Sequence, residues 1–406
     1  MNKTNIKNKQ IYVNLLDKSY FETIKSGVEK FNGEKDYLST KSINWDKIQK
    51  IESKIRFDSR PSRANMQPTN NSVWFAKMKN TIKVYYFDDK NIEEINKFIL
   101  STGFLGIKCK DSVVPTFLKY FFFSTRFNLL KDRLAKGSTQ QAINNSTLKQ
   151  IYVLIPTLKI QKKIVSVLER VDSLRQKREQ TNQLTDKLIQ AVFYKMFGDP
   201  VLNNRKFPME SLDNIVANGR YALKRGPFGG SLKKNIFVKE GYKVYEQQNA
   251  IKNDFELGHY YITSKKFEEM KAFSVNPGDI IISCSGTIGK VAIVPSNAKK
   301  GIINQALLKI TFDRNKISPI FAKFLIETPQ IQELLFGSAR GSGIRNIASM
   351  AILKSVQIPI PPLSLQNKFA EIAKKIEILK EKQKLSEVKI NNLFQSLTNI
   401  AFEVEL

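Results

Sequence analysis

The chain has 406 residues, 42% of them hydrophobic, and its 66 lysines and arginines outnumber 37 aspartates and glutamates to give a formal net charge of +29. This length and hydrophobic content suffice for two or more packed domains, and the positive charge favours a polyanionic partner, nucleic acid foremost, because bound phosphates release counterions. One histidine and two cysteines exclude a disulfide scaffold and a His/Cys metal centre, which needs three or four ligands close together.

Several other classes of protein are disfavoured. No apolar run is long enough to cross a membrane, and the first residues, MNKTNIKNKQ, lack the apolar core of a signal peptide. With so few cysteines we expect a cytoplasmic protein. The sequence contains no GxGxxG after a strand, no GxxxxGK[ST] and no Asn-Pro-Pro-aromatic tetrapeptide of amino-methyltransferases. These observations indicate a binding protein rather than an enzyme, without a metal or cofactor of its own.

The predicted elements occur twice along the chain, beginning with a hairpin. Residues 74–87, WFAKMKNTIKVYYF, resemble residues 280–294, IIISCSGTIGKVAIV. Apolar and β-branched residues flank a polar turn in both stretches, and this pattern predicts a β-hairpin at each place. The preceding residues 1–70 and 200–275 match poorly. We therefore expect two domains that share a scaffold and differ in their leading segments.

A helix is predicted next in each half. PTFLKYFF begins at Pro115, SPIFAKFL places Pro319 at the equivalent position, and proline is favoured in the first turn of a helix. After a Gly-Ser turn the chain reads LKQIYVLIPTLKIQ at residues 148–161 and LKSVQIPIPPLSLQ at residues 353–366, with the same residue at six of fourteen positions. Such a recurrence indicates that a whole structural unit is duplicated.

Each repeated phrase leads into a heptad pattern, which predicts a long helix that packs along its length on a partner helix. The positions are Ile164, Val167, Val171, Leu174, Arg178, Thr181, Thr185, Leu188 and Val192 in the first helix and Phe369, Ile372, Ile376, Leu379, Gln383, Ser386, Ile390, Leu393 and Leu397 in the second. Both patterns turn polar near the middle, where a polar layer fixes the register. Because the first helix leads into the second domain, the second helix meets it only by running back. We expect an antiparallel pair about 50 Å long.

Further short motifs follow the same order along the chain. They are RPSRANM (residues 60–66), FAKMKNT (75–81), FYKMFGDP at the end of the first long helix, KRGPFGGSL (224–232), PGDIIIS (277–283), GTIGKVAIV, NQALLKI (304–310) and the final SLTNIAF. Together with the repeat, this set resembles the specificity subunit of type I restriction–modification systems across essentially the whole chain. One departure is IPTLKIQ, where that family more often has Pro-Pro-Leu and an acidic residue before glutamine.

The resemblance implies an α+β fold with two pseudo-repeated target-recognition domains separated by two long antiparallel, coiled-coil-like helices. The expected boundaries are residues 1–157 and 200–362 for the domains and residues 158–199 and 363–406 for the central and C-terminal spacer helices. The implied function is that of a non-catalytic subunit that reads a bipartite double-stranded DNA site, one half per domain. Its implied partners are two methyltransferase subunits and the motor-nuclease subunits, and those partners would use S-adenosylmethionine, ATP and Mg²⁺.

Polar side chains that address DNA gather in the predicted loops. Arginine and lysine pair with guanine, asparagine and glutamine with adenine, and serine and threonine with several bases. The candidates in the first domain are Arg60, Arg63, Asn65, Gln67, Lys77, Lys79, Asn80 and Thr81. Those in the second domain are Lys224, Arg225, Ser231, Gln247, Gln248, Asn249, Ser285, Thr287, Lys290, Arg340 and Arg345. The glycines of LKRGPFGGSLKK would let backbone N–H groups approach a phosphate, and a plain structural turn explains them equally well.

Two other functions fit parts of the sequence. An enzyme that acts on nucleic acid would need a cofactor loop or a carboxylate cluster, and neither is recognisable. A free-standing basic nucleic-acid-binding or coiled-coil interaction protein would share the charge and the heptads, and it remains the alternative.

Overall fold

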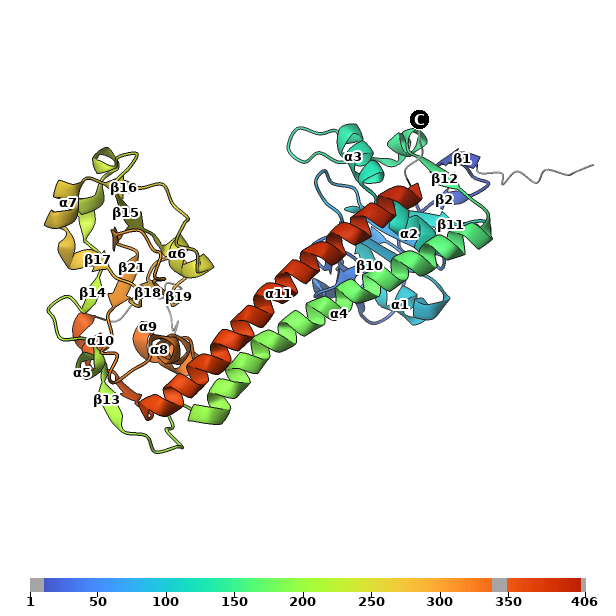
Figure 1. Cartoon of the computed structure of the whole chain (residues 1–406). Coiled ribbons are helices and arrows are strands. Elements are labelled where there is room, and N and C mark those ends of the chain that lie inside the picture. Colours follow the sequence, from blue (N-terminus) through green and yellow to red (C-terminus); the bar gives the residue numbers. More distant parts are fainter. Residues whose placement is uncertain (1–10, 338–348, 403–406) are drawn as a thin grey trace, which may run out of the picture. The chain divides into compact units, whose positions relative to one another are not determined.

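The structure, a computed structural model, describes residues 11–337 and 349–402 (Figure 1). The chain forms two compact units, one of residues 1–180 with 384–406 and the other of residues 181–383. Each unit combines a domain of helices and sheets with parts of two long helices, α4 (Leu158–Phe197) and α11 (Leu363–Phe402). The predicted α+β fold, with two domains and two long helices, is confirmed.

The described part of the first unit contains two four-stranded sheets and two strand pairs. One sheet has the order β2 (Phe21–Thr23), β11 (Phe104–Cys109), β8 (Ser72–Ala76), β9 (Val84–Phe87). The other has the order β6 (Ser53–Ile55), β3 (Lys35–Leu38), β10 (Phe98–Ser101), β7 (Ala64–Met66). The pairs are β1 (Ile11–Asn14) with β12 (Tyr152–Ile155) and β4 (Ile43–Asn44) with β5 (Lys47–Ile48). The shorter helices are η1 (Asp89–Asn91), α1 (Ile92–Lys97), α2 (Pro115–Phe123), α3 (Thr125–Leu134) and η2 (Asn145–Gln150).

The second unit repeats the order of both four-stranded sheets, and α6 (Gln247–Lys252) takes the place of the β4–β5 pair. Its sheets have the orders β14 (Leu223–Arg225), β21 (Leu307–Ile310), β18 (Ile280–Ser283), β19 (Val291–Ile293) and β16 (Tyr261–Ile262), β15 (Tyr242–Tyr245), β20 (Gly301–Ile303), β17 (Ser274–Val275). The strand pair is β13 (Met209–Ser211) with β22 (Gln357–Pro359). The helices are α5 (Leu212–Ile215), η3 (Gly229–Leu232), η4 (Lys234–Ile236), α6 (Gln247–Lys252), α7 (Ser264–Glu269), η5 (Lys271–Phe273), α8 (Pro319–Ile326), α9 (Pro329–Phe336) and α10 (Met350–Ser355).

The pairing senses of the strands agree as well. β10 pairs with β3 in parallel and with β7 antiparallel, and in the second unit β20 pairs with β15 in parallel and with β17 antiparallel. The duplication therefore includes the leading segments, whose sequences match poorly. A sheet is held by backbone hydrogen bonds that every residue except proline can supply, so the same ladder accepts different sequences.

The predicted hairpins and proline-led helices are confirmed in both units. β8 and β9 pair antiparallel, as do β18 and β19, and α2 and α8 begin at Pro115 and Pro319. β8 is buried along its whole length. Opposite its Trp74, β11 has Gly106, where an added Cβ would lie 2.6 Å from the indole ring. Glycine is therefore required for the indole to lie against β11.

A buried glutamine explains the repeated phrase in the first half. Gln161, in the first turn of α4, is completely buried. Its Oε1 accepts the N–H of Val114 at 2.9 Å, and its Nε2 donates to the carbonyl oxygens of Ser112 and Pro156, both at 2.9 Å. One side chain thus joins the start of the long helix to the residues that lead into α2.

The second half makes the same contacts with Gln366, which is also completely buried. Its Oε1 accepts the N–H of Ser318 at 2.8 Å, and its Nε2 donates to the carbonyl oxygens of Lys316 at 3.0 Å and Pro361 at 2.8 Å. The glutamine that ends both copies of the repeated phrase therefore fixes the start of each long helix to the domain that precedes it.

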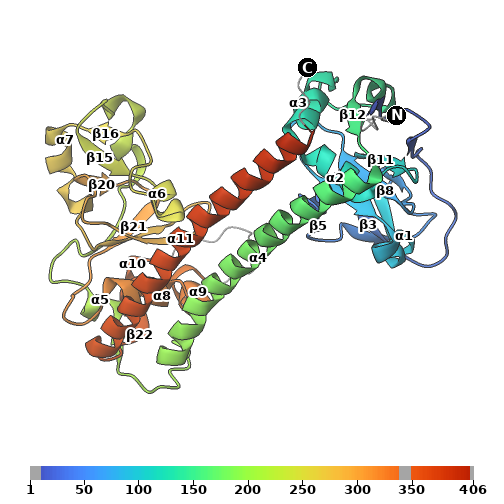
Figure 2. The same ribbon diagram turned by 45° about the vertical axis from the view of Figure 1, so that its right-hand side comes forward.

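The beginning of α4 lies against the end of α11 in the first unit. Arg175 Nε donates to Asn391 Oδ1 at 2.9 Å, and Val165 and Leu168 share a buried cluster with Phe402. In the second unit, conversely, the end of α4 lies against the beginning of α11 (Figure 2). The helices are therefore antiparallel, as expected.

Of the polar layer predicted at Arg178/Thr181 and Gln383/Ser386, Gln383 forms a contact between the helices in the second unit, with Thr185 as its partner. Gln383 Nε2 donates to Thr185 Oγ1 at 2.9 Å, and both side chains are buried. Around this contact the helices are joined by apolar residues, with the rings of Phe193 and Phe369 at 5.5 Å. A hydrogen bond between two buried side chains favours one register of the helix pair over its neighbours.

The heptad pattern is wrong at five of its apolar positions. Five predicted seam residues have exposed fractions between 43% and 50%; these are Val167, Leu174, Leu188, Leu379 and Leu393. On α4 the buried residues near the start are instead Val165 and Leu168, which also contact the aromatic cluster around α2. Each long helix packs on a domain as well as on the other helix, so its buried face is set by two neighbours and is displaced from a simple two-helix seam.

Replacing the buried glutamine should destabilise its unit. Gln161→Leu leaves one backbone N–H and two carbonyl groups without their partner, which we expect to lower the free energy of unfolding by about 2–4 kcal/mol. Urea denaturation followed by circular dichroism measures this change. Gln180→Leu, at an exposed position of the same helix, should change it by less than about 0.5 kcal/mol. Equal losses in the two variants would contradict the assigned role.

Candidate nucleic-acid interface

The first-domain turn that carries the candidate lysines is held from behind by a buried ammonium group. Lys131 of α3 is 1% exposed, and its Nζ donates to the carbonyl oxygens of Met78 at 2.9 Å and Thr81 at 2.6 Å. Burial lowers the pKa of Lys131, and the carboxylate of Asp132, 3.4 Å away, opposes that shift. Asp132 Oδ1 also accepts the backbone N–H of Asn80 at 3.0 Å. The turn is therefore fixed before any ligand arrives.

The loops that carry Arg63 and Lys77 both contact the turn at residues 102–103. The carbonyl oxygen of Arg63 accepts the N–H of Thr102 at 2.8 Å, and the N–H of Lys77 donates to Gly103 at 3.0 Å. Burial, and then the positive charge of Arg63, lowers the pKa of the Lys77 ammonium. Arg63 is exposed and Lys77 is half-buried. The structure thus brings these two cations together, although fourteen residues separate them in the sequence.

The other first-domain candidates differ in how free their side chains are. Arg60 is held by Phe57. Its Nη1 donates to the carbonyl oxygen of Phe57 at 2.6 Å, and its guanidinium lies 4.3 Å from the centroid of the Phe57 ring. Gln67 Oε1 accepts the N–H of Glu29 at 2.8 Å. The remaining candidates lie on the turn or at the nearby strand β7, half-buried or exposed: Asn65, Lys79, Asn80 and Thr81.

The second domain has an equivalent turn between β18 and β19. Ser283 Oγ donates to the carbonyl oxygen of Thr287 at 2.6 Å and accepts the N–H of Lys290 at 3.0 Å. Gln332 of α9 donates to the carbonyl oxygen of Gly289 at 2.9 Å. The turn is again held from behind by a helix, and it presents Ser285, Thr287 and Lys290 at its exposed surface.

The three neighbouring amides at the start of α6 have three different environments. Asn249 is completely buried and bonded to the backbone of Glu246, Asp254 and Leu257. We therefore leave it out of the proposed contacts. Gln248 Nε2 donates to the carboxylate of Glu246 at 2.8 Å.

Gln247 differs from its two neighbours. Its Oε1 is buried and has no hydrogen-bond partner among the described residues. Its Nε2 lies 3.9 Å from the point where a Cβ on Gly286 would stand, beside the turn that follows β18. A buried acceptor without a partner is costly, and a base edge that donates a hydrogen bond would satisfy it.

The LKRGPFGG segment is fixed by close packing. A Cβ on Gly226 would collide with the carbonyl group of Asn304, and the N–H of Gly226 donates to Leu307 at 2.8 Å. Close packing alone therefore explains why glycine stands at position 226. Lys224 and Arg225 are half-buried, next to aromatic rings, and Ser231 is exposed. Arg340 and Arg345 lie outside the described residues.

Sequence reasoning missed the two residues that hold the turns. Lys131 and Gln332 lie on α3 and α9, two helices that were not predicted from the sequence, and a polar residue on the apolar face of a helix is the signal that could have found them. Among residues 11–337 and 349–402 there is no group of three or more histidine, cysteine, aspartate or glutamate side chains placed to hold a metal ion. No helix in the same ranges has the length and apolarity to cross a membrane.

Comparison with known families gives a match in both halves. Residues 15–186 and residues 228–390 each match the type I restriction modification DNA specificity domain. The two matches cover most of the chain and follow the duplication seen in the sheets.

Two curated proteins illustrate the similarity. The chain is 25% identical over 295 residues to a putative type I restriction enzyme MjaX specificity subunit of Methanocaldococcus jannaschii, and 24% identical over 294 residues to the type I restriction enzyme EcoBI specificity subunit of Escherichia coli. These alignments include 69% and 66% of this chain and 66% and 61% of the two relatives. The chain therefore spans slightly less than two thirds of the length of these relatives.

Solved structures share the fold. A chain from work on complex assembly and conformational transition of the type I R-M system aligns with a TM-score of 0.65 at 18% identity. A type I restriction-modification S subunit from M. genitalium aligns with a TM-score of 0.51 at 15% identity. The alignments cover 100% of this chain and 100% and 99% of the others.

Removing the side chain behind one turn should loosen that turn alone. Lys131→Met deletes two hydrogen bonds to the first-domain turn, so the amides of residues 78–83 should exchange with deuterium at least about tenfold faster. Exchange in residues 284–290 should stay unchanged. Gln332→Leu is the matched control and should give the opposite pattern. Faster exchange throughout both turns in either variant would indicate general destabilisation instead.

Proposed function

Because the chain belongs to the family of the type I restriction modification DNA specificity domain, we propose that it is the DNA-specificity subunit of a type I restriction–modification complex. The observation that carries this proposal is the duplicated domain, with the same strand order in both units and a polar turn held from behind in each. A chain with two such domains can read two DNA half-sites. The role is binding and placement, with methylation and cleavage left to partner subunits.

DNA contact is proposed for the exposed face of each turn. Arg63 and Lys77 supply two adjacent cations in the first unit, and Gln247, Thr287 and Lys290 supply an amide, a hydroxyl and a cation in the second. Cations bind phosphates and guanine edges, and an amide pairs with adenine. The formal charge of +29 favours approach to DNA whatever its sequence.

Methyltransferase subunits are proposed to dock on the long helices. Leu174 and Leu393 are 50% and 47% exposed in the first unit, and Leu188 and Leu379 are 48% and 43% exposed in the second. The duplication of the chain relates the two sets, because Leu379 follows Leu174 and Leu393 follows Leu188 by the same interval. Exposed leucines on a helix indicate an interaction surface. Two equivalent sets therefore indicate two copies of the same partner.

The remaining partners and cofactors follow from this assignment. We place the motor-nuclease subunits on the same assembled core, and S-adenosylmethionine, ATP and Mg²⁺ in the partner subunits. The alternative is a free-standing basic nucleic-acid-binding or coiled-coil protein. It predicts binding to DNA without preference for a bipartite site and no stable complex with a methyltransferase.

Substitutions in the two units should alter different halves of the DNA site. In the assembled complex, Arg63→Ala should change base preference in one half-site and Gln247→Ala in the other, by about 1–3 kcal/mol each. Competition binding with duplexes substituted base by base measures both effects. Arg60→Ala, whose guanidinium is held by Phe57, is the matched control and should leave base preference unchanged. If each variant weakened both halves equally, these residues would be phosphate contacts or structural.

Charged residues on the helices should remove methyltransferase subunits one at a time. Leu174→Glu with Leu393→Glu, and separately Leu188→Glu with Leu379→Glu, should each reduce the number of bound copies from two to one, because each pair buries charge in one interface. Native mass spectrometry counts the copies. Leu129→Glu with Leu202→Glu, at residues 63% and 78% exposed away from the long helices, should retain both. Two bound copies with all four helix leucines replaced would contradict the assignment.

A further inference from the structure

In the first unit a turn with an aromatic and an acidic residue, Trp45 and Asp46, fills a site between helices, and we call this turn the plug. Trp45 lies in the turn between β4 and β5 with φ of +59°, a conformation that bulky side chains rarely adopt. Its ring stacks on Phe123 with centroids 4.4 Å apart, and the Arg175 guanidinium lies 4.5 Å from its centroid. The next residue, Asp46, forms an ion pair of 2.6 Å with Lys119 of α2, and both side chains are 8% exposed. The fold retains the strained backbone of Trp45 because the Trp45 ring and the Asp46 carboxylate are both held by neighbouring side chains.

The receptor for this turn is a set of charged residues on α2, α4 and α11. Asp172 pairs with Arg175 at 3.1 Å and with Lys119 at 3.7 Å, and Arg175 donates to Asn391 at 2.9 Å. Burial, and then the charge of Asp46, raises the pKa of Asp172. Two carboxylates therefore share the Lys119 ammonium, and one of them comes from the inserted turn.

The second unit keeps the charged positions of this receptor and has Glu327 in place of Phe123, on which Trp45 stacks. The repeat places Lys323 of α8 where the first unit has Lys119, Glu377 where it has Asp172, and Lys380 where it has Arg175. Lys380 pairs with Glu377 at 3.4 Å, as Arg175 does with Asp172. Lys380 also pairs with Asp186 at 2.9 Å, and Asp186 is the equivalent of Asn391.

The plug itself is missing from the second unit. Between β3 and β6 the first unit forms the β4–β5 hairpin, whereas between β15 and β16 the second unit forms α6. α6 packs elsewhere, with Ala250 in a buried cluster that includes Ile281 and Ala292. Lys323 forms no ion pair with any described residue, unlike Lys119. Burial raises the pKa of the neighbouring Glu327 carboxyl, and the charge of Lys323 opposes this larger effect by lowering it.

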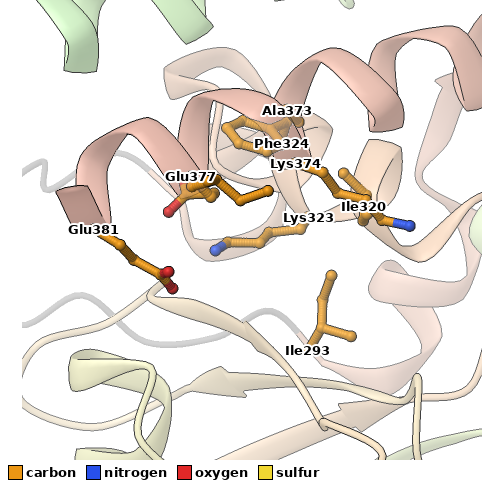
Figure 3. A pocket seen from close by; sticks show the side chains of 9 residues that line it. Ile293, Ile320, Lys323, Phe324, Ala373, Lys374, Glu377 and Glu381 are labelled. Atoms are coloured by element: carbon orange, nitrogen blue, oxygen red, sulfur yellow. The ribbon is translucent and has the colours of Figure 1, made fainter.

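An open site stands where the plug would be. Two adjoining pockets of about 350 and 520 Å³ share Lys323, Phe324 and Glu377. Figure 3 shows Lys323 between Glu377 of α11 and Ile293 of β19. Ile293 is the equivalent of Tyr86, which faces Lys119 in the first unit at 5.3 Å from the ring centroid. The apolar wall suits an aromatic ring, and the ammonium group beside it suits a carboxylate.

We propose that this site binds a turn of a partner protein in which an aromatic side chain is followed by an acidic one. The first unit gives the precedent for the acidic residue, since its own Asp46 pairs with Lys119, the equivalent of Lys323. Residues 338–348, SARGSGIRNIA, have neither an aromatic nor an acidic residue. A second copy of the chain has its own aromatic–acidic turn already engaged.

The probe for this site is a cyclic peptide of residues 42–49, SINWDKIQ, with 5-fluorotryptophan in place of tryptophan. Cyclisation follows the structure, because the N–H of Gln49 donates to the carbonyl oxygen of Ser42 at 2.8 Å. The full-length chain is titrated in without DNA or partner subunits, and the ¹⁹F resonance is followed. The expected result is saturable broadening and a shift of that resonance, with one peptide bound per chain.

Matched variants assign the binding to Lys323. Lys323→Glu should weaken the peptide at least about tenfold, because it replaces attraction to the aspartate with repulsion. Lys323→Arg should retain binding, and Lys239→Glu, an equal charge change at an exposed residue of the same unit that lines neither pocket, should change it by less than about twofold. Peptides with Trp→Ala or Asp→Asn should bind at least about tenfold more weakly.

Several results would overturn the proposal. They are absence of peptide binding, equal binding of the substituted peptides, and unchanged binding to Lys323→Glu. Displacement of the peptide by duplex DNA would assign the site to phosphate. Loss of peptide binding on concentration-dependent dimerisation of the chain would assign it to a second copy. None of these results bears on whether the complex recognises DNA, because the titration contains no DNA until the displacement step.

Discussion

One buried amide side chain in each half joins a domain to a long helix. Gln161 and Gln366 each satisfy one backbone N–H and two carbonyl groups, and neither has any exposed surface. Buried backbone groups without partners are costly, so this arrangement tolerates no sliding of the helix start against the loop that leads into α2 or α8. The positions of the polar turns depend on it, because α3 and α9, which hold those turns, follow directly after α2 and α8.

The duplicated frame allows the two halves to differ at the polar turns, where we propose that they contact DNA. Lys131 holds one turn with an ammonium group, and Gln332 holds the other with an amide. Both bonds end on backbone carbonyl groups, so the side chains of the turns can change without disturbing their support. The segment between β3 and β6 in the first unit differs even more from its counterpart between β15 and β16 in the second. It forms the plug with Trp45 in one unit and α6 in the other, and that difference leaves an equivalent receptor filled in one unit and open in the other.

Periodicity and repetition were sufficient to predict the two domains, the hairpins, the proline-led helices and the antiparallel pair. They failed at Leu174 and Leu379, because a heptad pattern records which residues are apolar and not which of two neighbours each one faces. They also failed to detect the repeat in the leading segments, where strand order is kept by backbone hydrogen bonds. Among the candidate contacts, the sequence could not separate Gln247 from Asn249, since only the fold shows that Gln247 has a buried acceptor without a partner among the described residues, whereas Asn249 is bonded to the backbone at both ends of its amide.

The central claim is that two domains on one frame give the complex a bipartite DNA specificity. Methylome sequencing of cells with and without the gene for this chain tests it most directly. The claim predicts that one methylated motif disappears, that the motif consists of two short specific half-sites separated by unspecified bases, and that it returns when the gene is restored. An unchanged methylome, or the loss of one continuous motif without a gap, would contradict the claim.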